Sequence, residues 1–447
     1  MLNAPQVLTG VLGTLKQQSL QTPGDLKLLL RLARLHIKSG NYSEAEKVFS
    51  KILKSSTDNA EILVEYAACL IKSSKFEEAE FQLERALALK PGMVQAFMTY
   101  ARLYEQKGDR AKQISFMMLA ANASPDNAEI RLTLAEQLRR YGDFNGAIEQ
   151  YQQILSNNPV QETANFSMGS ILMKQDKLQE AVQYFIKVLD NNPSALDAHF
   201  NLASCFFRQN KFAAAIGHFR VSLRDANLQN RSLYLLSQCY FKRNDFDQAI
   251  VSMERLIELD STNVCYRKCL GEFYEAVGEF DMACEVYSEL TALAPTKPEF
   301  WLKLAHSQIK IKRVDKAEKT LKRVFRVHPG HIEAHRVLAE LYSAKRQYKE
   351  AIEEFQRILM LNEKDGAAYI SLAEIYNQLN RDNEEMEALS KAVENGKESL
   401  NVLLRLGELE RKYKLPTSLD HFKRIQELAP ETDYAKEAEY YIRHLAA

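Results

Sequence analysis

Four histidines lie close together in the sequence, namely His306, His328, His331 and His335. His331 and His335 are four positions apart, and two histidines at this spacing on a helix can bind Zn²⁺. A zinc site needs further ligands, and no Cys, Asp or Glu completes this pair at a fixed spacing. The sequence therefore predicts no metal site and no cofactor.

Cys265 and Cys269 are also four positions apart and can lie together on one helix. Two thiols on consecutive turns of a helix rarely form a good disulfide, so we do not expect a reactive pair. Cys69, Cys205 and Cys239 share one phase of the repeat described below, which is typical of small buried residues. Six cysteines in 447 residues form no disulfide framework.

Motifs that carry common enzyme chemistry are absent from the sequence. It contains no phosphate-binding G-x-x-x-x-G-K-[ST] loop, no dinucleotide-binding G-x-G-x-x-G, no G-x-S-x-G nucleophile turn and no H-E-x-x-H zinc helix. We therefore expect a protein that is not an enzyme.

The charge of the whole chain is balanced, with 59 Lys and Arg against 59 Asp and Glu. This balance argues against a nucleic-acid partner, which normally requires a basic excess. One segment, residues 298–331, nevertheless carries nine basic and three acidic residues, and the preceding segment, 264–297, carries three and six. We favour a solvated face that the acidic neighbours balance, and the alternative is a docking patch for an acidic protein surface. The candidate basic patch is Lys303, Lys310, Lys312, Arg313 and Lys316.

The sequence contains no run of 18 apolar residues, and residues 1–10 lack the pattern of a secretory signal. We therefore expect a cytoplasmic protein with no membrane insertion.

A repeat of 34 residues organises almost the whole chain. A small residue recurs at this spacing without a change of phase: Ala45, Ala79, Ala147, Ala181, Ala215, Ala249, Ala283, Ala317 and Ala351. A second small residue lies twelve positions before each of these, and an aromatic or large apolar residue lies four positions after. Each unit thus predicts two amphipathic helices whose backbones approach closely at the small residues.

Turn-forming residues separate the predicted helices. Gly, Asn or Asp stands between the two helices of most units, as at Gly108, Asn210 and Asp176, and these residues tolerate the left-handed conformation that ends a helix. Proline closes many units, as at Pro295 and Pro329.

This pattern resembles the tetratricopeptide repeat family, which shows Leu-Gly/Ala, Tyr, Ala, Phe/Tyr and Pro over 34 residues. The ninth unit, for example, has Trp301, Leu304-Ala305, Ala317 and Pro329. The resemblance implies an all-α fold, a right-handed α-solenoid whose first helices line the concave surface. About twelve units span residues 26–430. A partial repeat or cap helix is expected in 1–25, where Pro23 follows it, and a capping helix in 431–447.

Several positions depart from the pattern. Gln113 and Glu385 replace the small residue of the second helix, so we expect looser packing in the third and eleventh units. Asn227 and Ser261 replace the closing proline, so we expect the helices that flank the seventh unit to run longer or to turn differently. Three turns that lack Gly, Asn or Asp are expected to differ slightly, at Ser74, Lys312 and Arg346.

The resemblance implies that the fifth and twelfth positions of a unit face the groove. In units five to seven these positions carry aromatic residues or Met, each pair followed by a cation. We expect an aromatic strip here that binds a partner, and the alternative is that these side chains pack between helices. The candidate contact residues are Phe166, Met173, Lys174, Phe200, Asn201, Phe207, Arg208, Tyr234, Gln238, Phe241 and Lys242.

The function expected from these observations is a non-enzymatic scaffold for protein–protein interaction. Its partner would be a protein segment with apolar anchors and acidic flanks. The alternative is a self-associating structural element that assembles through its terminal repeats, because the C-terminal helix carries several apolar residues: Tyr434, Tyr440, Tyr441, Ile442 and Leu445.

Overall fold

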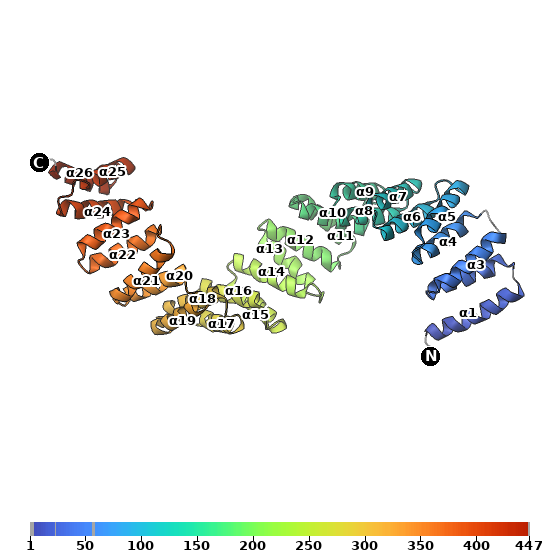
Figure 1. Ribbon diagram of the computed structural model, residues 1–447, viewed down its shortest axis with the longest axis horizontal. Coiled ribbons are helices and arrows are strands. Elements are labelled where there is room, and N and C mark those ends of the chain that lie inside the picture. The colour runs from blue at the N-terminus through green and yellow to red at the C-terminus, as the bar shows by residue number, and fades with distance from the viewer. Residues whose placement is uncertain (1–3, 23, 56–58, 446–447) are drawn as a thin grey trace. The chain divides into compact units, whose positions relative to one another are not determined.

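A computed structural model of the protein describes residues 4–22, 24–55 and 59–445. All regular secondary structure in these residues is α-helical, which confirms the predicted all-α class, and the helices follow one another as antiparallel pairs (Figure 1). The described part of the chain forms 26 helices, and α2 to α25 supply the two helices of twelve repeat units.

The first helices of the units begin at a constant phase of the repeat. They are α2 (Leu26–Lys38), α4 (Ala60–Lys72), α6 (Val94–Lys107), α8 (Ala128–Arg140), α10 (Glu162–Lys174), α12 (Leu196–Arg208), α14 (Gln229–Lys242), α16 (Val264–Val277), α18 (Pro298–Lys310), α20 (Ile332–Ala344), α22 (Gly366–Gln378) and α24 (Leu400–Lys412).

The second helices keep the same phase. They are α3 (Tyr42–Ser55), α5 (Phe76–Leu89), α7 (Arg110–Ala123), α9 (Phe144–Asn157), α11 (Leu178–Asn191), α13 (Phe212–Ser222), α15 (Phe246–Leu259), α17 (Phe280–Leu293), α19 (Val314–Val327), α21 (Tyr348–Leu361), α23 (Asp382–Glu394) and α25 (Ser418–Leu428).

One further helix lies at each end, α1 (Ala4–Gln21) and α26 (Asp433–Leu445). They fall within the two segments that we expected to flank the repeats, although Pro23 lies outside the described residues. The division at residues 25 and 430 stays a prediction.

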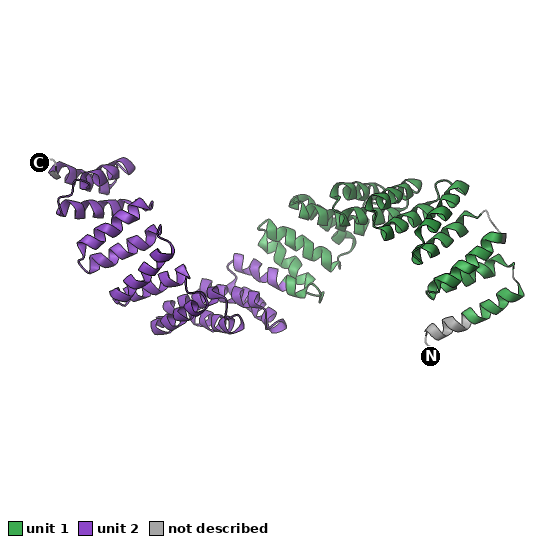
Figure 2. Ribbon diagram, in the orientation of Figure 1, with its two compact units in different colours: residues 1–232 green, residues 233–447 purple. Residues whose placement is uncertain are grey.

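The helices form two compact units, Met1–Ser232 and Leu233–Ala447 (Figure 2). Each unit is a stack of helical pairs with its own buried apolar clusters. The boundary between them falls inside α14, in the seventh repeat.

Close contact between the two helices of a pair explains why small residues recur. A Cβ atom added to Gly169 of α10 would lie 2.9 Å from the ring of Phe185 on α11, and one added to Gly271 of α16 would lie 2.6 Å from Tyr287 on α17. Both distances are shorter than van der Waals contact. A larger residue would therefore overpack the pair.

The turn inside each pair uses a left-handed residue. Gly108 has φ of 76° and Asn210 has φ of 59°. Ser74, Lys312 and Arg346 adopt the same conformation, with φ of 60°, 60° and 59°, so the expectation that their turns differ is wrong. Tertiary packing holds these three residues in a conformation that their types do not favour.

The two polar residues at the small position do not loosen their pairs. Gln113 is 3% exposed and Glu385 is 2% exposed, and their helix pairs are packed as closely as the others. The Gln113 carbonyl accepts a hydrogen bond from Tyr141 Oη at 2.6 Å, and Glu385 is held by Arg405. The expected loosening is wrong because each of these buried polar groups has a hydrogen-bond partner.

The expected change is present at Asn227, but it is wrong at Ser261, because α15 ends at Leu259, at the same phase as the end of α11. Helix α13 ends at Ser222, three residues earlier in the phase than α11, and a run of turns then leads to α14. The buried hydroxyl groups of Ser222 and Ser232 lie 2.8 Å apart and join these two helices.

Successive units are tied together by a contact that recurs in six of the described repeats. A side-chain N–H at the fourth position of the first helix points to the backbone carbonyl six residues earlier, in the turn that ends the preceding unit. The contacts join Arg131 Nε to Pro125, Asn165 Nδ2 to Pro159, His199 Nε2 to Pro193, Arg267 Nη1 to Ser261, Trp301 Nε1 to Pro295 and His335 Nε2 to Pro329. The donor fixes the inter-repeat turn against the start of the following helix.

Within the described residues, no helix combines the length and the apolar character that crossing a lipid bilayer requires.

Candidate functional site

Four cavities lie between first helices of neighbouring repeats. In the first compact unit, a groove of about 840 Å³ lies between α6 and α8, and a smaller one of about 320 Å³ lies between α4 and α6. In the second unit, cavities of about 320 and 330 Å³ lie between α18 and α20 and between α22 and α24. Cavities between neighbouring first helices therefore recur in both compact units.

The largest groove has a floor from both helices of the third repeat. Met93, Met98 and Met117 contribute flexible apolar surface, and the buried Gln113 contributes an amide. Sequence reasoning missed this groove. The signal that could have found it is the polar residue at a phase that is otherwise Ala, because Glu385 likewise lines the cavity between α22 and α24.

The part of the predicted strip on α10 is half-buried. Phe166 packs edge-on against Phe185, with ring centroids 5.8 Å apart, and Met173 contacts the same apolar cluster. Lys174 is exposed, and its ammonium lies 5.9 Å from the centre of the Phe144 ring.

Phe200 on α12 is not an exposed anchor. Its side chain is 5% exposed, packs edge-on against Phe219 at 5.8 Å and is covered by the Arg231 guanidinium at 4.7 Å. The alternative reading, packing between helices, describes this residue, and the neighbouring Asn201 is partly exposed.

Phe207 and Arg208 lie at the end of α12. Phe207 is half-buried, with its ring edge-on to Phe212 at 5.8 Å. Arg208 donates to the Met173 carbonyl at 2.8 Å and to the Asp176 carboxylate at 2.6 Å. Arg208 therefore interacts with the C-terminal end of α10, where a positive charge is favourable, and is less available to a partner.

The remaining strip residues belong to the second compact unit. The Tyr234 hydroxyl lies 3.9 Å from Cys269 Sγ, and Phe241 stacks on Phe273 with ring centroids 4.5 Å apart. Gln238 is partly exposed and Lys242 is exposed. Burial raises the pKa of the Cys269 thiol to about 11, so this cysteine is protonated at neutral pH and a poor nucleophile.

The predicted basic patch divides into paired and unpaired cations. Lys303 donates to Glu275 at 2.8 Å, and Arg313 donates to Asp281 at 2.8 Å, so acids of the preceding repeat balance both. Lys310, Lys312 and Lys316 are exposed, and none of them has an ion-pair partner among the residues that the structure describes.

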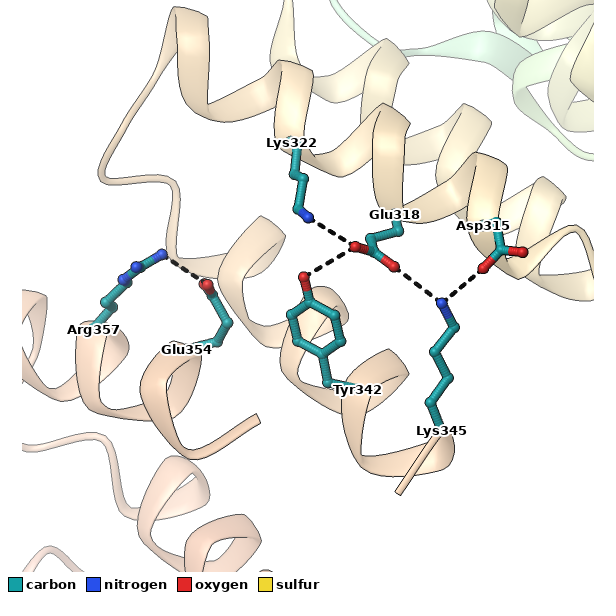
Figure 3. Close-up of polar contacts among 7 residues, drawn as sticks. All are labelled: Asp315, Glu318, Lys322, Tyr342, Lys345, Glu354 and Arg357. Atoms are coloured by element: carbon teal, nitrogen blue, oxygen red, sulfur yellow. Dashed lines mark hydrogen bonds and ion pairs between the residues drawn. The ribbon is translucent and has the colours of Figure 1, made fainter. Parts of the chain in front are cut away.

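A network of charges joins the ninth and tenth repeats (Figure 3). Glu318 accepts from Lys322 at 2.7 Å and from Lys345 at 3.0 Å, and Lys345 also donates to Asp315 at 2.9 Å. These lysines lower the pKa of the Glu318 carboxyl to about 2. The Tyr342 hydroxyl completes the network, with 3.2 Å to Glu318.

His331 and His335, the pair with zinc-ligand spacing, bind different groups of the chain. His335 is buried and contacts Glu354 at 2.5 Å and the Pro329 carbonyl at 3.0 Å, whereas the His331 side chain accepts from the Ala334 N–H at the start of α20. In the part of the chain that the structure describes, no three His, Cys, Asp or Glu side chains are placed to hold a metal ion.

The C-terminal helix uses most of its apolar residues internally. Tyr434, Tyr441 and Ile442 pack against a buried cluster that includes Phe422, and Tyr440 is 56% exposed. The Leu445 side chain lies outside the described residues.

Comparison with known proteins places this architecture. Two curated relatives match part of the chain. Protein O-mannosyl-transferase TMTC1 from Homo sapiens is 25% identical over 38% of this chain and 20% of its own length. The TPR repeat-containing protein YpiA from Bacillus subtilis (strain 168) is 26% identical over 32% of this chain and 34% of its own length. The chain thus spans about a third or less of these relatives.

Solved structures of helical repeat proteins are also similar. The C-terminal part of a TPR repeat-containing protein from Cytophaga hutchinsonii has a TM-score of 0.48 and 15% identity, over 54% of this chain and 99% of that one. Yeast Tom70 has a TM-score of 0.35 and 16% identity, over 94% of this chain and 95% of that one.

Family models described as tetratricopeptide repeats match along the chain. One matches residues 132–185, 166–230 and 337–399, a second matches 12–63 and 275–341, and a third matches 94–127 and 231–263. Together these segments cover more than half of the chain. The chain therefore belongs to the tetratricopeptide repeat family.

Proposed function

We propose that this protein is a non-enzymatic scaffold that binds a segment of a partner protein along the surface of its first helices. The observation that carries the proposal is the recurrence of cavities between neighbouring first helices, in both compact units. Concave, partly apolar surfaces of this kind are where soluble proteins bind ligands and partners.

The half-buried side chains on α10 and α12 are the proposed apolar contacts in the first unit. Phe166, Met173 and Phe207 each pack one side against the core and keep part of their surface accessible. Residues of this type are pre-ordered by their packing, so binding costs little side-chain entropy. Phe200 is buried and is therefore not one of the proposed contacts.

The exposed cations of the strip are the proposed contacts for acidic flanks. Lys174 and Lys242 are exposed, and Arg208 contributes less because Asp176 already pairs with it. In the second compact unit, the half-buried residues Tyr234, Gln238 and Phe241 are the proposed contacts that correspond to those on α10 and α12. In the first compact unit, Asn201 offers an amide beside Phe200. The cytoplasmic location stays a prediction.

Self-association through the terminal repeats has less support. The C-terminal helix buries Tyr434, Tyr441 and Ile442 at least partly within its own unit, which leaves Tyr440 as its exposed ring.

A displayed library of random peptides tests the proposal without a known partner. Peptides selected on the wild-type protein are measured against Met173→Ser and Phe207→Ser, and against the control Ile186→Ser. Ile186 lies on second helix α11 and is 41% exposed, so the same loss of apolar surface is made away from the first helices. We expect Kd to rise about tenfold or more for the first-helix variants, the loss expected for an anchor worth about 1.4 kcal/mol or more.

Circular dichroism before and after heating shows that each variant is folded. Selected peptides whose Kd changes equally in Ile186→Ser, or that ignore both first-helix variants, contradict binding at this surface.

A further inference from the structure

Three of the nine cations of the ninth repeat are already paired with acids of the chain. Lys303 pairs with Glu275, Arg313 with Asp281, and Lys322 with Glu318. Each pair joins atoms less than 3 Å apart, so these three cations are balanced before any partner arrives. The basic excess of this repeat therefore has to be sought in the cations that remain.

Two of the remaining cations, Lys310 and Lys312, lie where α18 turns into α19, whereas Lys316, Lys319, Arg323 and Arg326 lie along α19. Lys310 ends α18, Lys312 forms the following turn, and Arg346 forms the equivalent turn of the tenth repeat, 34 residues later. All three are exposed, and across residues 59–445 none has an ion-pair partner. Two successive turns thus place long basic side chains where the other repeats mostly place Gly or Asn.

These turns border the cavity between α18 and α20, which measures about 320 Å³. Its apolar walls come from five aliphatic side chains, Ile309, Val314, Val337, Leu341 and Ala344. Lys312 lies in sequence between the wall residues Ile309 and Val314. This volume is near the lower end for small-molecule pockets, so the cavity suits one or two side chains.

Three polar groups also line the cavity, and one of them is already neutralised. Lys345 donates to Asp315 and to Glu318, as Figure 3 shows, so its charge and those of both acids are satisfied within the chain. His306 and Glu340 are exposed at the wall. Partial burial and Glu333 raise the pKa of the Glu340 carboxyl, against the opposing effects of Arg336 and His306.

The unpaired cations outnumber the unpaired acid at this cavity. Glu340 lines the cavity, whereas Lys310, Lys312 and Arg346 do not line it but flank the wall residues Ile309, Val314 and Lys345 in sequence. The field at the mouth of the cavity therefore favours a negatively charged ligand. The aliphatic wall favours an apolar side chain of that ligand. A basic segment would meet repulsion at the turns, and an entirely polar one would leave the wall without contact.

We propose that the cavity between α18 and α20 binds an acidic protein segment that inserts one aliphatic or aromatic side chain while its carboxylates pair with Lys310, Lys312 and Arg346. This site does not depend on the aromatic strip, since the two use different residues and different helices. It gives the scaffold a second point of attachment, for a partner of defined charge.

A synthetic peptide measures this binding directly. The probe is a fluorescein-labelled 12-residue peptide with one central Leu, three Glu on each side and Gly elsewhere. Its binding to the protein is measured by fluorescence anisotropy in 50 mM salt. Two comparison peptides replace the Leu by Ser or all Glu by Gln. We expect both to bind at least fivefold more weakly, and 300 mM salt to weaken the probe itself, since rim charges are screened.

Three variants of the full chain locate the site. Lys310→Glu/Lys312→Glu removes the cations and Val314→Ser removes part of the wall, and each should raise Kd at least fivefold. Arg326→Glu is the control, because it changes an exposed cation of the same repeat on α19, twelve residues and about 18 Å along the helix from Val314.

An equal loss in Arg326→Glu would show general charge attraction and overturn the proposal. The same is true if the Ser-containing peptide binds as tightly as the probe, or if no binding is seen at millimolar peptide. We expect peptides selected against the strip to be insensitive to these variants, so failure here and failure of the proposed function are distinguishable.

Discussion

Arg405 binds both carboxylate oxygens of Glu385, with Nε 2.7 Å from Oε1 and Nη2 3.0 Å from Oε2. Glu385 is 2% exposed and occupies the position where most repeats carry Ala. Arg405→Met removes the guanidinium and leaves a buried carboxylate with only the amide of Asn377. We expect the free energy of unfolding to fall by about 2–4 kcal/mol, measured by urea denaturation.

The double variant Glu385→Ala/Arg405→Met is the matched control. It restores the common residue of the repeat and leaves no buried charge, so its stability should lie within about 1 kcal/mol of wild type. A double variant as unstable as Arg405→Met would show that Arg405 stabilises the chain by some route other than Glu385.

Phe200 and Phe207 should respond differently to truncation. Phe200 is buried between Phe219 and Arg231, so Phe200→Ala should cost about 3–5 kcal/mol. Phe207 is half-buried, and Phe207→Ala should cost about half as much or less because it leaves a smaller cavity. Thermal unfolding of the two variants checks the ranking, and equal costs would contradict the assignment of Phe207 to the accessible surface.

The Trp301 indole donates to the Pro295 carbonyl at 2.9 Å. Trp301→Phe keeps an aromatic ring but removes the donor, and we expect a loss of about 1 kcal/mol. The measurement is the midpoint of urea unfolding, with an unchanged m-value. His335→Phe at the same phase is a harsher comparison, because it also deprives buried Glu354 of a partner.

His199 and His218 make part of the stability depend on pH. Their Nδ1 atoms lie 2.8 Å apart, and His199 Nε2 faces the Pro193 carbonyl, so a neutral His199 accepts the proton of His218. Burial, and then His199, lower the pKa of His218 below its ordinary value of 6.5. As the pH falls below 6.5, the unfolded chain takes up this proton before the folded chain, and the free energy of unfolding decreases.

Urea unfolding at pH 7.5 and at pH 5.5 tests this effect. His218→Gln removes the titrating group, so its stability should change less between the two pH values than that of wild type. A pH dependence unchanged by the substitution would assign the effect to other buried histidines, such as His36, whose pKa burial also lowers.

The helical framework was predictable because packing imposes its own period on the sequence. Gly169 and Gly271 must be small because they contact Phe185 and Tyr287 closely, so the 34-residue repeat can be recognised from the sequence alone. What lies between helices was less predictable. The resemblance placed Phe200 in the groove with Phe207, yet Arg231 of the following repeat covers Phe200. The residue type at position 200 does not reveal a contact that another repeat supplies.

Polar substitutions were misjudged for a related reason. Gln113 and Glu385 look unfavourable beside the small residues of other repeats, but Tyr141 and Arg405 satisfy them from 28 and 20 positions away. The same limit applies to Lys303 and Arg313, whose acids lie in the preceding repeat.

The donors to the inter-repeat carbonyls are Arg, Asn, His and Trp, which share neither size nor charge. In the six repeats that make this contact the residue type varies, but the capacity to donate a hydrogen bond is shared, whereas Leu29, Leu63, Phe97, Leu233 and Leu403 carry no donor at the same position. Substitution tables will score an exchange of Trp for His here as disruptive, although both deliver a proton to the same oxygen. Repeats four to six and eight to ten can therefore be aligned by the side chain that donates to the carbonyl six residues earlier, whatever its residue type.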